Sequence, residues 1–105
     1  MKLIVAYIQP FMVDKLSRAL LKAPIGGYTL LEGKGFGHAN EESTDYHEPR
    51  LRVEIAVTDD HVDEVTQIIS SSVGRHRDQD GLILVLDVIA AVSIKTGKRN
   101  EEALI

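Results

Sequence analysis

Residues 34–57 read KGFGHANEESTDYHEPRLRVEIAV, and this stretch decides the fold. It opens on a glycine-phenylalanine-glycine turn at 35–37 and continues as a polar run over 38–49 without apolar periodicity. From 51 to 57 every second residue is apolar, which predicts a strand with one buried face. Because residues 28–36 also have a strand pattern, two strands flank a loop of about a dozen residues. A loop of that length on a small domain is usually functional or disordered.

The segments before this hairpin predict a strand and a helix. Residues 2–9 are apolar on both faces, which is typical of a strand that is covered on both sides. Pro10 stops that strand and can open a helix, because its missing N–H is not needed in the first turn. Apolar residues then recur at helical spacing up to Ala23, and Pro24 is expected to end the helix.

The segments after the hairpin repeat this order. A helix-start signal at 58–60 precedes an apolar stripe over 62–73, and residues 82–88 predict a fourth strand. Residues 90–95 fit either a turn of helix or a fifth strand, and residues 96–105 form a turn and a tail. The order β-α-β-β-α-β predicts one α+β domain over residues 1–105, the ferredoxin-like sandwich.

The second face of the predicted sheet needs a cover. Two helices can cover only one face of a four-stranded sheet, yet the first and fourth strands are apolar on both faces. The obvious candidate for the cover is another copy of the same chain.

Composition excludes several classes of protein. A chain of 105 residues with 44% apolar residues can bury a real core. A net charge of −4 and 5% aromatic residues argue against nucleic-acid binding. The absence of cysteine excludes disulfides and thiolate metal sites. No apolar run approaches the roughly 20 residues of a membrane helix, and no signal peptide precedes the first strand, so we expect a cytoplasmic protein without membrane insertion.

Several segments resemble the P-II family of signal-transduction proteins, and together they cover almost the whole chain. They are residues 2–11, 27–37, 49–60, 80–81 and 96–104, of which KGFG at 34–37 and the TGKRNEEA tail are the most specific. The resemblance implies a ferredoxin-like protomer in a homotrimer that binds adenine nucleotides in the clefts between protomers. It also implies a protruding T-loop, here about residues 38–49, that docks onto a membrane transporter or a metabolic enzyme.

The resemblance implies nucleotide-binding roles at a set of positions that match the family's site residues or stand in their places. These positions are Thr29, Gly35, Phe36, Gly37, Arg50, Glu54, Gly74, Arg75, Asp80, Gly81 and Lys95. The turn at 35–37 would form a cleft wall, although glycines there also fit a bulged strand end. The glycine-bounded loop 74–81 corresponds to the family's phosphate-binding B-loop and fits either a phosphate cradle or a solvated loop.

Most departures from the family pattern are at positions where family members contact the terminal phosphates of the nucleotide. His38 and Ala39 stand where the family has an arginine and the glutamine that helps to hold magnesium and 2-oxoglutarate. Leu82 replaces the phosphate-pairing lysine, and Ser93 and Lys95 replace an arginine pair. The T-loop is also shorter than usual, and its tyrosine at position 46 is not in the context that some bacterial members uridylylate. We therefore expect ADP or AMP to bind at least as well as ATP.

A metal site is the alternative function. The polar loop contains two imidazoles and three carboxylates, a plausible set for zinc, copper or nickel, at His38, Glu41, Glu42, Asp45 and His47. A trimeric sandwich similar to the CutA-like proteins, or to P-II relatives linked to heavy-metal efflux, would have such a site; a polar surface loop often has the same composition. No nucleophile motif is present, so we expect a regulator and not an enzyme.

Overall fold

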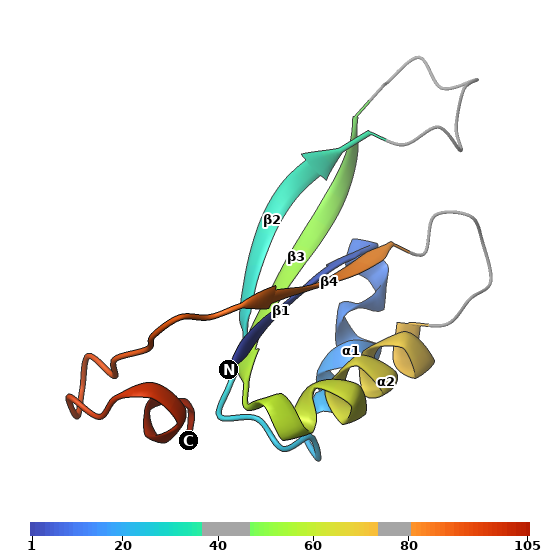
Figure 1. The fold of residues 1–105 in the computed structure, drawn as a ribbon. Helices are drawn as coiled ribbons and strands as arrows, with labels where there is room; N and C mark the ends of the chain where they lie inside the picture. The colour runs from blue at the N-terminus through green and yellow to red at the C-terminus, as the bar shows by residue number, and fades with distance from the viewer. Residues whose placement is uncertain (37–46, 74–80) are drawn as a thin grey trace.

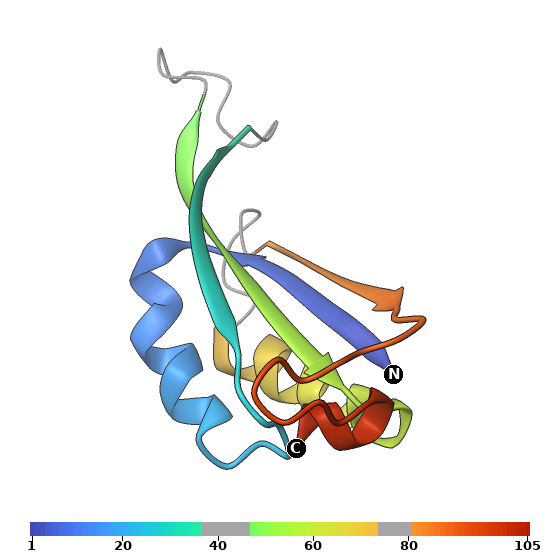
Figure 2. The same ribbon diagram turned by 90° about the vertical axis from the view of Figure 1, so that its left-hand side faces the viewer.

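The computed structural model describes residues 1–36, 47–73 and 81–105, and its centre is an antiparallel four-stranded sheet (Figure 1). The strands are β1 (Lys2–Ile8), β2 (Thr29–Gly35), β3 (Glu48–Val57) and β4 (Leu82–Asp87), in the spatial order β2-β3-β1-β4. The helices α1 (Val13–Leu20) and α2 (Val62–Val73) lie together on one face of the sheet (Figures 1 and 2). This arrangement confirms the predicted ferredoxin-like α+β fold.

The core lies between the two helices and the face of the sheet that they cover. Alternation places Ile4 and Ile8 of β1 on this face, next to Val53 and Ile55 of β3, and all four are buried. Helical spacing brings buried side chains of both helices onto them, namely Leu16, Leu20, Val65, Ile69 and Val73. Burying each large side chain stabilises the fold by about 1.5–3 kcal/mol, so this layer holds the sheet in place.

The opposite face of the sheet, which we call the open face, is apolar along β1 and β4 and carries neither α1 nor α2 (Figures 1 and 2). In register across β1 and β4, Leu3 pairs with Leu86, Val5 with Leu84 and Tyr7 with Leu82. The three leucines of β4 are exposed, whereas Val5 is only 1% exposed between its neighbours. In a single chain, the apolar surface that lacks a cover therefore lies mainly on β4.

Two boundaries differ from those predicted from the sequence. The first helix ends at Leu20, well before Pro24, and residues 21–24 form a turn and a bend. Pro24 disfavours helical backbone at Ala23, so the helix does not resume there. β3 begins at Glu48 and includes Pro49, which was predicted to belong to the loop. β1 ends opposite Leu51, so residues 48–50 have β2 alone as a strand neighbour and a proline without an N–H is tolerated.

The segment after β4 is neither a helix nor a fifth strand of the sheet. Residues 88–99, which we call the arm, leave the sheet and return through a turn that is closed by a single bridge between Val92 and Arg99 (Figure 1). The amide of Ser93 donates to the Lys98 carbonyl at 2.8 Å, which stabilises this turn. The predicted tail contains a short 3-10 helix, η4 (Asn100–Leu104), that contacts β3.

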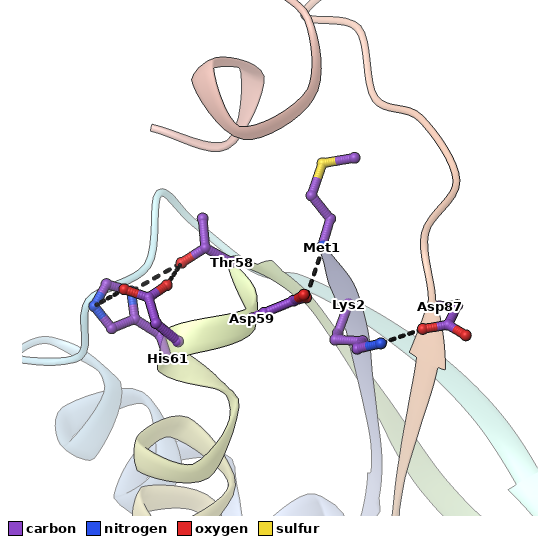
Figure 3. Close-up of polar contacts among 7 residues, drawn as sticks. Met1, Lys2, Thr58, Asp59, His61 and Asp87 are labelled. Carbon is purple, nitrogen blue, oxygen red and sulfur yellow. Dashed lines mark hydrogen bonds and ion pairs between the residues drawn. The ribbon is translucent and has the colours of Figure 1, made fainter.

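A polar cluster marks the start of α2 (Figure 3). The Thr58 hydroxyl donates to the Asp60 carboxylate at 2.5 Å and also lies 3.2 Å from Nδ1 of His61. Asp59 pairs with the amino group of Met1 at 2.7 Å, and Lys2 pairs with Asp87. The hydrogen bond from Thr58 lowers the pKa of Asp60 below its ordinary value of 3.8.

Replacing Thr58 by valine is expected to raise the pKa of Asp60 towards 3.8, because the donor that favours the carboxylate is lost. The folded pKa lies below the unfolded value, so the stability that this contact contributes is present above about pH 3.8 and is lost as the pH falls through the folded pKa. NMR titration of the Asp60 carboxyl carbon checks the shift. Thr58→Ser keeps the hydroxyl and should retain the low pKa; an unchanged pKa in Thr58→Val would contradict the assignment.

Candidate functional site

Two of the predicted nucleotide-binding residues meet on the open face. Thr29 opens β2 and lies directly opposite Glu54 of β3. Alternation places the side chain of Glu54 on the open face, beside Val5 of β1. A hydroxyl and a carboxylate therefore lie next to each other on the open face, an arrangement that can hydrogen-bond a ligand and fix its orientation.

Arg52 and Tyr7 belong to this cluster, and sequence reasoning missed both. Nη2 of Arg52 lies 3.0 Å from the Glu54 carboxylate, and Nη1 of Arg52 donates to the Tyr7 hydroxyl at 3.3 Å. The guanidinium also lies 5.8 Å from the centre of the Tyr7 ring, within the range of a cation–π contact. The alternation of the strand puts Arg52 on the same face as Glu54, and this pattern could have identified Arg52 from the sequence. Tyr7 could not be found in this way, because only the register between β1 and β3 brings it beside Arg52.

Arg50 and the glycine turn form the second part of the site, near the end of the hairpin. The Arg50 side chain packs over Gly35, where a Cβ atom would lie 3.0 Å from Cγ of Arg50. Nη1 of Arg50 donates to the Pro49 carbonyl at 3.0 Å and pairs with Glu48 at 3.3 Å. The lack of a side chain at Gly35 thus positions the arginine, while Phe36 beside it is exposed.

A pocket of about 470 Å³ adjoins Arg50. It is lined by residues of the hairpin and of the turn after β1, namely Pro10, Glu32, Gly33, Lys34, Pro49, Arg50 and Leu51. Two cations and one carboxylate line it, a set that suits an anionic group. Its volume lies in the range of small-molecule sites.

The structure does not bring all described site residues into one pocket of a single chain. Thr29 and Gly35 lie at the two ends of β2, about 20 Å apart at roughly 3.3 Å per residue. Gly81 has a φ of +109° and approaches the Tyr7 backbone so closely that a Cβ atom would overlap the Tyr7 carbonyl oxygen. Lys95 belongs to the arm, which runs away from the hairpin end of the sheet (Figures 1 and 2).

The remaining predicted site residues lie outside the described part of the chain. For nucleotide binding these are Gly37, Gly74, Arg75 and Asp80, and for the metal alternative His38, Glu41, Glu42 and Asp45. His47, the described member of the metal set, is exposed just before β3. Within residues 1–36, 47–73 and 81–105, no three histidine, aspartate or glutamate side chains gather as a metal site would require. In the same ranges, no helix is long and apolar enough to span a membrane.

Comparison with known proteins identifies the family. A family model described as nitrogen regulatory protein P-II matches residues 1–98. The chain is 35% identical to a nitrogen regulatory protein P-II of Rhizobium etli, 32% identical to the nitrogen regulatory protein GlnK of Escherichia coli K12 and 33% identical to a P-II protein of Porphyra purpurea. Each alignment covers 99% of this chain and all of the relative. With its ferredoxin-like sheet and its match along nearly the full length, this chain belongs to the nitrogen regulatory protein P-II family of signal-transduction proteins.

Proposed function

We propose that the protein is a cytoplasmic homotrimeric regulator that binds an adenine nucleotide between its copies and controls a membrane transporter or a metabolic enzyme through the loop that joins β2 to β3. The observation that carries the proposal is the open face, where the exposed leucines of β4 lie on one side of β1 and the polar pair Thr29 and Glu54 lies on the other. Burying these leucines against another copy encloses the polar pair in a cleft. The names of the relatives support a role in nitrogen regulation.

Each described residue has a distinct part in the proposed cleft. Thr29 and Glu54 hydrogen-bond the base or the sugar, and Gly35 lets the nucleotide approach the backbone of β2. Arg50 supplies a cation for the phosphates. Lys95 extends from the arm of a neighbouring copy, since the arm lies beyond its own sheet and carries fully exposed isoleucines at positions 89 and 94.

The loop that joins β2 to β3 transmits the state of the cleft to the partner protein. A nucleotide that binds one loop conformation better than another shifts the population towards it. Gly35 ends β2 and Glu48 begins β3, so both ends of the loop are fixed next to Arg50. In this proposal Arg50 binds the phosphates at the base of the loop, so a change at the phosphates reaches the loop directly.

ADP and AMP are expected to bind at least as tightly as ATP, because Leu82 and Ala39 stand where the family has a lysine and a glutamine that serve the terminal phosphate and magnesium. Each lost charge-assisted contact costs about 1.5–3 kcal/mol, roughly tenfold to a hundredfold in affinity. Magnesium with 2-oxoglutarate should add nothing. Calorimetric titration of one preparation with ATP, ADP, AMP and zinc measures all of these affinities.

Two outcomes of that titration would overturn the proposal. Tight magnesium-ATP binding that 2-oxoglutarate strengthens would contradict the expected nucleotide preference. The absence of binding by every adenine nucleotide at millimolar concentration would remove the cleft function itself. Binding of zinc alone would favour the metal site, and His38→Ala combined with His47→Ala should then abolish it.

A further inference from the structure

A second pocket, of about 500 Å³, lies at the end of β3 that is remote from the β2–β3 loop. The turn after α1, the end of β3 and η4 form its apolar walls, with Ala23, Ile25, Gly26, Ala56, Val57 and Leu104. Its volume falls in the range of pockets that hold a small molecule. It shares no lining residue with the proposed nucleotide cleft, and the inference drawn from it does not depend on nucleotide binding.

Polar groups converge at one side of this pocket. Thr58, Asp60 and His61 line it there, and they belong to the cluster at the start of α2 (Figure 3). The Thr58 hydroxyl holds the Asp60 carboxylate at 2.5 Å, which fixes the direction of that side chain. Asp60 is the only carboxylate side chain among the lining residues, and no lysine or arginine of the described chain lines the pocket. The polar side therefore carries the Asp60 carboxylate, which lies 3.8 Å from Nε2 of His61 and has no lysine or arginine beside it among the lining residues.

Gly26 fixes the wall that η4 provides. A Cβ atom at this position would overlap the carbonyl oxygen of Leu104, so the close approach of η4 to the turn after α1 requires glycine. Gly27, the next residue, has no atom within 4 Å of a Cβ added to it. Alanine substitutions at these two glycines therefore provide a matched pair for testing whether ligand binding requires the wall that η4 forms.

We propose that this pocket binds a small molecule with an apolar body and a primary amine, whose ammonium group pairs with the Asp60 carboxylate. The apolar walls favour the body of such a ligand through the burial of its surface. Asp60 repels an organic acid of the same shape, and it gives a neutral alcohol no ion pair. Charge and shape together thus select an amphipathic cation.

Titration followed by amide NMR spectra tests the proposal with phenethylamine, phenethyl alcohol and hydrocinnamate, which combine one type of body with three different polar groups. Phenethylamine is expected to shift the amide signals of residues 56–61 and 103–105 and to bind more tightly than the other two. Asp60→Asn should weaken amine binding roughly threefold to fivefold, because the ion pair is largely exposed. High salt should reduce the difference between the amine and the alcohol.

Matched variants separate the pocket from general surface effects. Gly26→Ala should abolish binding by displacing η4, whereas Gly27→Ala should leave it unchanged. Asp63→Asn removes a nearby acid that does not line the pocket and should also have no effect. Equal affinity for the three probes, no binding of phenethylamine, or full amine affinity in Asp60→Asn would each overturn the proposal.

Discussion

Gly81→Ala is expected to lower the free energy of unfolding by about 3 kcal/mol or more, the largest loss for a single methyl group that the structure predicts. Gly81 has a φ of +109°, a backbone conformation that a residue with a Cβ atom rarely adopts. The added Cβ atom would also overlap the carbonyl oxygen of Tyr7 in β1. Relief requires β4 to move away from β1 at the point where the two strands begin to pair.

Variants at two other glycines separate the cost of the backbone conformation from the cost of the overlap between the added Cβ atom and its neighbours. Gly97 has a φ of +74° but no atom within 4 Å of an added Cβ, so Gly97→Ala should cost about 1–2 kcal/mol from the backbone alone. Gly33 has neither constraint, and Gly33→Ala should be nearly neutral. Urea denaturation of the three variants measures the order. Equal losses in all three would contradict the account of the contact between Gly81 and Tyr7.

Leu84→Asp is expected to leave the protomer folded and to weaken the proposed trimer roughly a thousandfold or more, because it buries an unpaired charge in the interface. The Leu84 side chain is 41% exposed on the open face, so an aspartate there stays hydrated in a single chain. Val5 is adjacent to it on β1 but is only 1% exposed. Val5→Asp should therefore unfold the chain itself, with its charge forced next to Glu54.

Sedimentation equilibrium and circular dichroism together distinguish these outcomes. The unmodified protein should sediment as a trimer, and Leu84→Asp as a folded monomer. Leu21→Asp provides the control, because Leu21 is 82% exposed beyond the end of α1 and should tolerate a charge without losing the trimer. A monomeric unmodified protein at micromolar concentration, or a trimeric Leu84→Asp, would contradict the role of the open face.

The order of elements could be predicted because the local periodicity matches the buried faces. The alternation at 51–57 and the stripe at 62–73 correspond to side chains that the structure buries against each other. The start of β3 could not be predicted, because Glu48 and Pro49 have the composition of a loop and become a strand only by pairing with Gly35 and Lys34. That pairing depends on tertiary structure, and no local preference of these two residues indicates it.

The candidate site was predictable to the extent that it follows one strand. Arg50 and Glu54 share a face by alternation alone, and the structure confirms their common face. The contact of Arg52 with Tyr7 joins residues 45 positions apart, so it depends on the register between β1 and β3. Lys95 cannot be placed from one chain, since its arm leaves the sheet and the proposed cleft needs a neighbouring copy.

Binding of ADP to mixed trimers tests most directly the claim that each cleft is shared between two copies. Arg50→Ala and Lys95→Ala alter opposite walls of the proposed cleft, so each variant alone should bind ADP weakly. After subunit exchange at equal amounts, about a quarter of the clefts should combine two unaltered walls and recover full affinity in calorimetry, as random mixing in a closed ring requires. If mixing restores no high-affinity sites although exchange is confirmed by mass spectrometry, the two residues do not act across one shared cleft and the proposed mechanism is wrong.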